Sequence, residues 1–162
     1  MLFLILIDLV CILDQLTKHV AIRCLSHGES LAVIPGFFSV RHVRNTGAAW
    51  GLFSDLNSWL VLFSFLVLGA LFFFRRAILR TSMFHRIAVA LIVAGVLGNL
   101  LDRLRFGFVV DFFDFYWGSW HFPTFNIADC AICIGVAIYV FASYLVDSPF
   151  ARAKTHQDAP VS

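Results

Sequence analysis

Four long blocks of apolar residues constrain the fold of this 162-residue chain more than any other feature. They cover residues 2–13, 59–74, 87–101 and 127–146. Apolar residues make up 60% of the chain and charged residues only 14%, whereas a soluble domain has about half and about a quarter. The blocks approach the length that a helix needs to cross a bilayer. We therefore expect an all-α membrane protein with four transmembrane helices, with residues 1–150 as one domain and 151–162 as a flexible cytoplasmic tail.

The first and third of these blocks need separate consideration. Residues 2–13 have no basic segment ahead of them and no small-residue cleavage site behind them, so we expect a retained span rather than a signal peptide. Residues 87–101 would be roughly 22 Å long as a helix, against a hydrocarbon core of about 30 Å. This block spans only if the polar residues after it are buried against protein, or if the bilayer thins locally.

Charge indicates the orientation. The loop 75–86 carries four arginines and no acid, whereas most acidic residues fall on the opposite face. We expect this loop to be cytoplasmic, and an even number of spans then places both termini on the same side. The net charge of +2 and the absence of a basic stripe argue against nucleic acid as a partner.

The opposite face holds a small β-element and many aromatic residues. A turn at Pro35-Gly36 followed by the rough alternation of FFSVRHV predicts one or two short strands within residues 25–53. The aromatic residues resemble an interfacial belt, which either anchors loops at the headgroups or handles a ligand within the membrane. They are Trp50, Trp59, Trp117, Trp120, Phe112, Phe113, Phe115 and Tyr116.

Polar residues gather at the ends of the spans on this face, where charges usually serve function. Taken singly, each has a structural explanation. Asp14 and Lys18 have the spacing of a helical salt bridge. Asn126 and Asp129 have the spacing of an N-cap and its acidic third residue. The others are Asn99, Asp102 and Arg103 at the end of the third block, and Asp111 and Asp114 in the following loop.

Two of these carboxylates suggest a reaction. If Asp111 and Asp129 approach one another, repulsion and desolvation raise the pKa of one, and the pair holds a single proton near neutral pH. The positive end of the fourth helix favours Asp129 as the ionised partner. One ionised and one protonated carboxyl can activate water for peptide hydrolysis. Spacing alone leaves Asp111 with Asp114 as a rival pair.

Two other functions are compatible with the sequence. Cys130 and Cys133 form a C-x-x-C, which with Cys11 and Cys24 would suit a membrane thiol-disulfide oxidoreductase. Their apolar surroundings favour helix packing instead. A proton-coupled carrier could use the buried acids, but these gather at one face rather than deep in the spans. The six histidines lack metal-binding spacing, so we expect no metal site.

Five stretches together resemble the lipoprotein signal peptidases (signal peptidase II), intramembrane aspartic peptidases of bacteria. They are DQLTK at 14–18, RNTGAAWGLF at 44–53, AGVLGNLLDR at 94–103, VVDFFDFY at 109–116 and FNIADCAICIG at 125–135. They occur in the family's order and extend over most of the chain. The family fold, four transmembrane helices with a small extracytoplasmic sheet and a surface-lying helix, agrees with the analysis above.

The resemblance implies a reaction and its residues. Such enzymes work in the cell inner membrane and cut the signal peptide from a prolipoprotein before a cysteine that carries diacylglycerol. The family's catalytic pair falls on Asp111 and Asp129, with no cofactor, and we expect a monomer. Its supporting and substrate-binding residues fall on Asp14, Asn45, Asn99, Asp102, Arg103, Asn126 and Ala128. Asp8, Asp114 and the cysteines are not part of its motifs.

Overall fold

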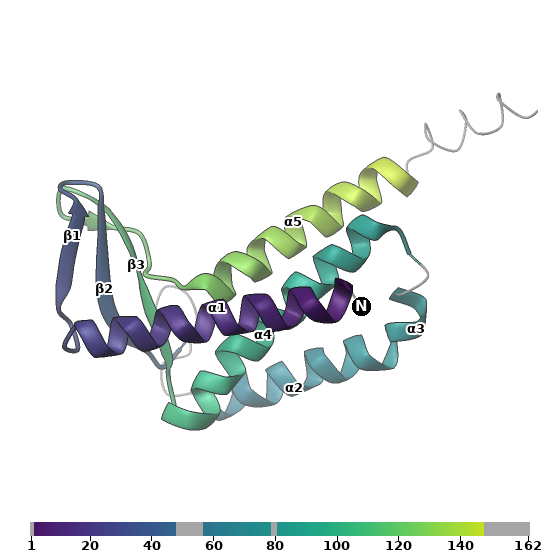
Figure 1. Ribbon diagram of the computed structural model, residues 1–162, viewed down its shortest axis with the longest axis horizontal. Coiled ribbons are helices and arrows are strands. Elements are labelled where there is room, and N and C mark those ends of the chain that lie inside the picture. Colours follow the sequence, from purple (N-terminus) through teal and green to yellow (C-terminus); the bar gives the residue numbers. More distant parts are fainter. Residues whose placement is uncertain (1, 48–56, 79–80, 148–162) are drawn as a thin grey trace, which may run out of the picture.

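A computed structural model describes residues 2–47, 57–78 and 81–147. Helices and a small sheet occupy opposite ends of the molecule (Figure 1). The helices are α1 (Leu2–Cys24), α2 (Asn57–Phe73), α3 (Arg75–Ile78), α4 (Met83–Phe106) and α5 (Ile127–Asp147). The strands are β1 (Ser30–Ile34), β2 (Phe38–Asn45), β3 (Val109–Trp117) and β4 (Trp120–His121).

Helix α4 is the centre of the bundle, and α1, α2 and α5 all pack against it (Figure 1). Its contact with α5 is close because it is lined by glycines. A Cβ atom at Gly135 would lie 2.7 Å from the carbonyl oxygen of Ala88. A Cβ atom at Gly98 would lie 2.6 Å from Oδ2 of Asp14 on α1. Small residues thus let backbones approach, as is usual between membrane helices.

Both short blocks of the sequence belong to longer helices. The condition set for the third span is met, because the polar residues Asn99 and Asp102 are buried against protein, and α4 has 24 residues and is about 36 Å long. It continues through its polar residues until Gly107, which adopts φ 79° and donates its N–H to the carbonyl of Arg103. Likewise α1 extends to Cys24, since Asp14 and Lys18 in its second half are buried and paired with each other.

Within the described residues, two helices are long and apolar enough to cross a membrane, Met83–Phe106 and Ile127–Leu145. Helix α2 is apolar but has only 17 residues, and α1 contains Asp8, Asp14 and Lys18. Large apolar side chains on the outer faces of α1, α2 and α5 are exposed, including Leu16, Leu66 and Phe141. A soluble protein would bury such faces, so lipid is the solvent that suits them.

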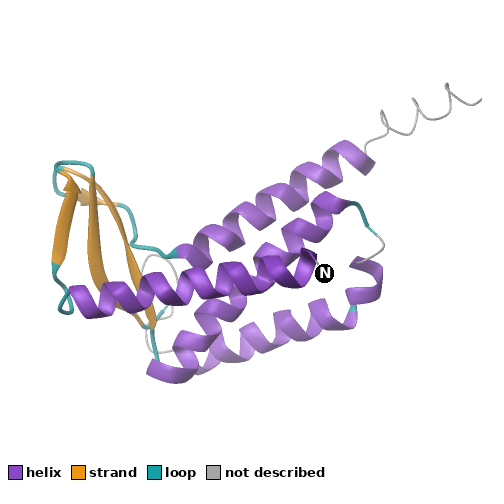
Figure 2. Cartoon of the chain, viewed as in Figure 1, coloured by secondary structure: helices purple, strands orange, loops and turns teal. Residues whose placement is uncertain are grey.

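The β-element is larger than the sequence indicated. Its four antiparallel strands lie in the order β1-β2-β3-β4. The strands gather at one end of the long helices (Figure 2). The strands expected within residues 25–53 are confirmed as β1 and β2. Residues 109–117 were expected to form a loop, which was wrong, because they form the central strand β3. This strand lacks polar alternation since its first four residues are all buried, and its neighbour β2 lies far away in the sequence.

The aromatic residues of this region divide into two groups. Trp59, Trp117 and Trp120 are exposed, as an interfacial belt requires, whereas Phe112 is buried and belongs to the core. Trp50 lies outside the described residues. Among the described residues at the sheet end, helices occur only as the ends of α1, α2, α4 and α5. The segment 48–56, which joins β2 to α2, lies outside the described ranges.

Candidate active site

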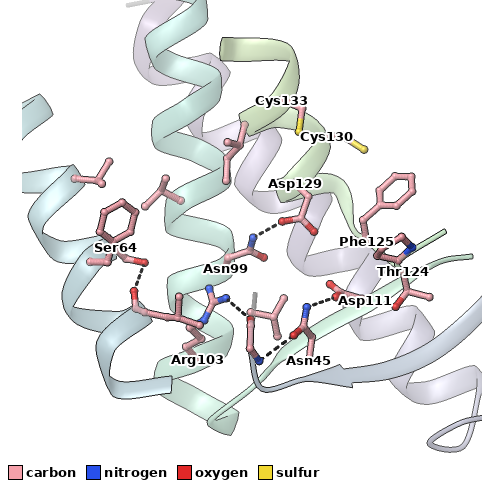
Figure 3. A pocket seen from close by; sticks show the side chains of 18 of the residues that line it. Asn45, Ser64, Asn99, Arg103, Asp111, Thr124, Phe125, Asp129, Cys130 and Cys133 are labelled. Atoms are coloured by element: carbon pink, nitrogen blue, oxygen red, sulfur yellow. Dashed lines mark hydrogen bonds between the residues drawn. The ribbon is translucent and has the colours of Figure 1, made fainter. Parts of the chain in front are cut away.

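A cavity of about 680 Å³ lies where the bundle meets the sheet. Its walls come from α2, α4, α5, β3 and the segment 122–125 that leads into α5. Most of the lining is apolar, including Leu60 and Phe63 of α2. The charged and amide side chains that line it are Asn45, Asn99, Arg103, Asp111 and Asp129 (Figure 3). Such a wall suits an apolar ligand handled by a few polar groups.

Asp111 on β3 is buried and held by two amides. Asn45 Nδ2 donates to its Oδ2 at 2.8 Å, and Asn126 Nδ2 donates to its Oδ1 at 2.6 Å. Burial, followed by the charge of Asp129, raises the pKa of Asp111 from its ordinary 3.8 to about 7, although both amide bonds oppose the shift. With a pKa of about 7, Asp111 can carry the proton that the pair was expected to share near neutral pH.

Asp129 reaches the cavity because of how α5 begins. Asn126 accepts a hydrogen bond at Oδ1 from the backbone N–H of Asp129 (3.0 Å), and Asp129 Oδ2 accepts one from the N–H of Asn126 (3.1 Å). This reciprocal arrangement confirms the predicted N-cap. The remaining oxygen, Oδ1, accepts from Asn99 Nδ2 at 2.8 Å. The cap therefore also fixes the carboxylate toward the cavity.

Behind these groups lies a second buried polar cluster around Lys18. Its Nζ lies 2.9 Å from Asp14 Oδ2 and 3.0 Å from Asp102 Oδ2. It also donates to Asn99 Oδ1 at 3.0 Å. The predicted helical salt bridge is confirmed, but its ammonium group also reaches α4. Asn99 also donates from Nδ2 to Asp129 Oδ1. The Lys18 cluster therefore orients the amide that holds the Asp129 carboxylate.

Other predicted residues act through backbone or neighbouring groups. The N–H of Ala128 donates to Asp14 Oδ1 at 2.9 Å, which ties α5 to α1. Asp102 Oδ2 accepts from the N–H of Val110, which positions the start of β3. Arg103 Nη2 lies 3.4 Å from the carbonyl oxygen of Gly47. These contacts thus tie α5 to α1, the start of β3 to α4, and Arg103 of α4 to the residues after β2.

The structure separates Asp114 from the cavity. Asp114 Oδ2 accepts from Ser39 Oγ at 2.8 Å, and its Oδ1 contacts His121 Nδ1 at 2.8 Å. It is absent from the lining, whereas Asp111 and Asp129 both line the cavity. This argues against the rival pair of Asp111 with Asp114. Asp8 is exposed on α1.

The cysteines lie in three different settings. Cys130 and Cys133 line the cavity near Asp129 (Figure 3). Cys11 packs against α4, with its Sγ 3.4 Å from the carbonyl oxygen of Ala94, and Cys24 is exposed. All four are free thiols. No group of three or more potential metal ligands occurs in the part of the chain that the structure describes.

Sequence reasoning missed two groups. Gln15 donates from Nε2 to Asp102 Oδ1 at 2.9 Å and to Asp14 Oδ2 at 3.2 Å, and so bridges the two acids of the Lys18 cluster. Its place beside Asp14 in DQLTK was the available signal. His121 was considered only as one of the six histidines without metal-binding spacing, whereas it contacts Asp114. That contact joins different strands, so spacing could not reveal it.

Comparison with known proteins identifies the family. The family model for signal peptidase (SPase) II matches residues 6–145. The chain belongs to the signal peptidase II family. It is 42% identical over 144 residues to the lipoprotein signal peptidase of Syntrophotalea carbinolica, covering 87% of this chain and 89% of that one. It is 45% identical over 134 residues to that of Desulforapulum autotrophicum, covering 80% and 83%.

Solved structures agree with this membership. A bacterial membrane enzyme determined by the in meso method at 2.3 Å resolution superposes with a TM-score of 0.84, at 33% identity, covering 99% of this chain and 94% of that one. A second, at 1.9 Å, gives 0.77 at 36% identity, covering 86% and 90%. The chain is therefore a membrane enzyme and an aspartic-type signal peptidase. The oxidoreductase and carrier interpretations find no support in these comparisons.

Proposed function

We propose that Asp111 and Asp129 are the catalytic pair of this peptidase, and that it removes the signal peptide from diacylglyceryl-modified prolipoproteins. The observation that carries the proposal is the cavity they share, in which Asp111 has a pKa of about 7. The names of the relatives, lipoprotein signal peptidases, support the substrate class. The bond that breaks is the one before the lipidated cysteine.

The reaction follows from one protonated and one ionised carboxyl. Asp129, whose carboxylate lies at the positive end of α5, takes a proton from water as the oxygen attacks the scissile carbonyl. Asp111, protonated, gives its proton to the developing oxyanion. When the tetrahedral intermediate collapses, the C–N bond breaks and the amine of the cysteine leaves with the proton that Asp129 holds, while one hydroxyl of the intermediate returns its proton to Asp111 as the carbonyl re-forms. Because the two acids titrate together, these roles describe the dominant protonation state.

The neighbouring residues keep this pair in position. Asn45 and Asn126 hold both oxygens of Asp111, and Asn99 holds one oxygen of Asp129. Arg103, at the cavity wall, is placed to bind a carbonyl of the substrate. Asp14, Asp102 and the N–H of Ala128 support these elements from behind. Preorganised donors of this kind are most effective where water is scarce.

The cavity also suits a substrate that arrives from the bilayer. It is lined by α2 on one side and α5 on the other, and both helices pack on α4. Leu60 and Phe63 of α2 and Ile132 of α5 offer an apolar surface to acyl chains. The substrate therefore enters sideways from lipid, as one with a diacylglycerol group must.

The proposal includes a membrane arrangement. All four long helices span the bacterial inner membrane, and the enzyme acts as a monomer. The ends of α1 and α4 that meet the sheet lie on the extracytoplasmic side with the site. Arg75, Arg76 and Arg86 lie at the opposite end, and their positive charge favours the cytoplasm. Residues 1–150 form the single peptidase domain, and residues 151–162 are its cytoplasmic tail.

The test is cleavage of a diacylglyceryl-modified prolipoprotein by the purified protein in detergent. We expect a cut before the lipidated cysteine, with Asp111→Asn and Asp129→Asn each reducing kcat by at least about a thousandfold. Asp8→Asn, on the exposed face of α1, is the matched control and should keep full activity. Thermal unfolding should show that all variants are folded. Full activity in either dyad variant would disprove the assignment of the pair.

A further inference from the structure

One wall of the cavity lacks regular secondary structure. Residues 122–125 run from β4 to α5 and all four line the cavity. At the α5 end this wall is fixed firmly. The carbonyl oxygen of Phe125 accepts from the N–H groups of Phe112 (3.1 Å) and Phe113 (2.9 Å), and its own N–H donates to Phe113 O at 3.2 Å. The wall is thereby tied to β3 immediately before the capping residue Asn126.

At the other end the wall has a weaker backbone anchor. Strand β4 has only two residues, which pair with the end of β3. The N–H of Phe122 donates to the carbonyl oxygen of Phe115 at 2.8 Å. Both residues of β4 are exposed. A hairpin of this size is marginally stable on its own, so something else must hold it.

A buried carboxylate supplies that anchor. Asp114 on β3 is only 2% exposed and accepts from Ser39 Oγ of β2 (2.8 Å). Its other oxygen lies 2.8 Å from Nδ1 of His121 on β4, whose side chain is 44% exposed. The imidazole also stacks on Tyr116, with ring centroids 5.3 Å apart. A carboxylate this deeply buried is stable only when its oxygens are bonded, so it requires both partners.

We propose that Ser39, Asp114 and His121 form a clasp that positions residues 122–125 as a wall of the substrate cavity. This proposal assigns a role in substrate binding to residues outside the proposed catalytic pair, and it rests on the proposed function. Asp114 touches neither the cavity nor Asp111, so these are positioning residues. The Ser39 contact joins strands that already pair, whereas the His121 contact secures the short hairpin. His121 is therefore the residue whose loss should release the wall.

Loss of the His121 contact should affect substrate binding more than the chemical step. The α5 end of the wall stays bonded to β3 in the absence of the clasp, so Asn126 and its bond to Asp111 remain in place. Loss of the clasp frees residues 122–124, which contact bound substrate only as a wall. An interaction that serves ground state and transition state alike appears in KM. The expected signature is a raised KM with kcat preserved.

The experiment compares His121→Ala with His121→Asn, whose side-chain amide can donate in place of Nδ1. Ser119→Ala, in the same hairpin and exposed, is the matched control. We expect His121→Ala to raise KM about fivefold to tenfold, with kcat within about twofold, equivalent to about 1–1.4 kcal/mol of binding. His121→Asn should restore most of the loss. Asp114→Asn, which keeps an acceptor for His121, should resemble His121→Asn.

Amide hydrogen exchange measures the clasp without any cleavage. The Phe122 amide should exchange at least about tenfold faster in His121→Ala than in the parent, while the Phe125 amide stays protected. Unchanged exchange at Phe122, or an unchanged KM, would overturn the proposal. A fall in kcat with unchanged KM would also overturn it, since His121 would then act on the chemistry. Absence of cleavage by the parent protein would disprove the peptidase function, whereas exchange would still report on the clasp.

Discussion

The molecule contains two buried pairs of aspartates that differ in how their charge is balanced. Asp14 and Asp102 share the ammonium group of Lys18, within 3.0 Å of each. Asp111 and Asp129 are bonded instead by neutral amides, and no ion pair to either occurs within the described residues. A cation thus balances the charge of the first pair. In the second pair, burial and the charge of Asp129 raise the pKa of Asp111 to about 7, which suits the proton donor of the proposed mechanism.

The largest expected effect comes from removing the cation of the first pair. Lys18→Met should destabilise the protein by about 3–5 kcal/mol, because it leaves two buried carboxylates uncompensated. Thermal unfolding in detergent measures this loss. Arg23→Met, on the exposed end of the same helix, is the control and should change stability little. If Lys18→Met unfolded at the parent's temperature, the contrast between the two pairs would be wrong.

The second expectation concerns pH and activity. The proposed mechanism requires Asp111 to be protonated as the acid, and burial together with the charge of Asp129 raises its pKa to about 7. A carboxyl loses its proton as pH rises through its pKa, so kcat/KM should fall above about pH 7, by about tenfold per unit. Initial cleavage rates between pH 5.5 and 9 would show this limb. A flat profile from pH 7 to 9 would mean that Asp111 does not supply the proton.

A smaller effect links the same group to stability. The folded protein raises the pKa of Asp111 from 3.8 to about 7, so within this window it binds more protons than the unfolded chain. Its stability therefore falls as pH rises from about 4 to 7. Asp111→Asn lacks this dependence, so its unfolding temperature relative to the parent should rise by several degrees between pH 5 and pH 8.

A control at an exposed acid makes that measurement specific. Asp8→Asn, on the exposed side of α1, should follow the parent at both pH values. A constant difference between Asp111→Asn and the parent from pH 5 to pH 8 would contradict the raised pKa.

The sequence predicted the helices and most of the site because those signals are local. The apolar blocks, the spacing of Asp14 and Lys18 and the cap at Asn126 each depend on residues a few positions apart. Strand β3 was missed because it is buried and pairs with β2, some seventy residues earlier. For the same reason, the sequence named Asp111 and Asp129 without showing that they line one cavity. Long-range packing determines both the pairing of β3 with β2 and the position of these two side chains.

Local spacing could not supply the partners of the helix ends either. An apolar block stops where charge begins, but a helix continues if other elements pair the charge. Asp102 in α4 meets Lys18 of α1, so the helix extends beyond the apolar block. Likewise the position of Asp114 in the expected loop did not reveal which side chain it contacts. The partner from β4 decided that question.

The smallest expected effect is at the two cavity thiols. Cys130→Ser and Cys133→Ser should leave kcat/KM within about twofold of the parent, singly and together, because serine has nearly the same volume. Neither thiol bonds Asp111 or Asp129 within the described residues, so neither belongs to the catalytic pair. Cleavage assays on the double variant provide the measurement. Loss of activity would give these thiols a role in the reaction.

Cys133→Phe sharpens the contrast, since it fills space in the cavity and leaves the chemistry untouched. The larger side chain should raise KM at constant kcat, by roughly the tenfold that corresponds to 1.4 kcal/mol of lost binding. Leu145→Phe, at an exposed position near the far end of the same helix, is the control and should change neither kcat nor KM. Equal KM in Cys133→Phe and the parent would show that substrate does not pass this part of α5. Cys133→Ser thus tests whether the thiol takes part in the reaction, whereas Cys133→Phe tests whether this part of the cavity wall binds substrate.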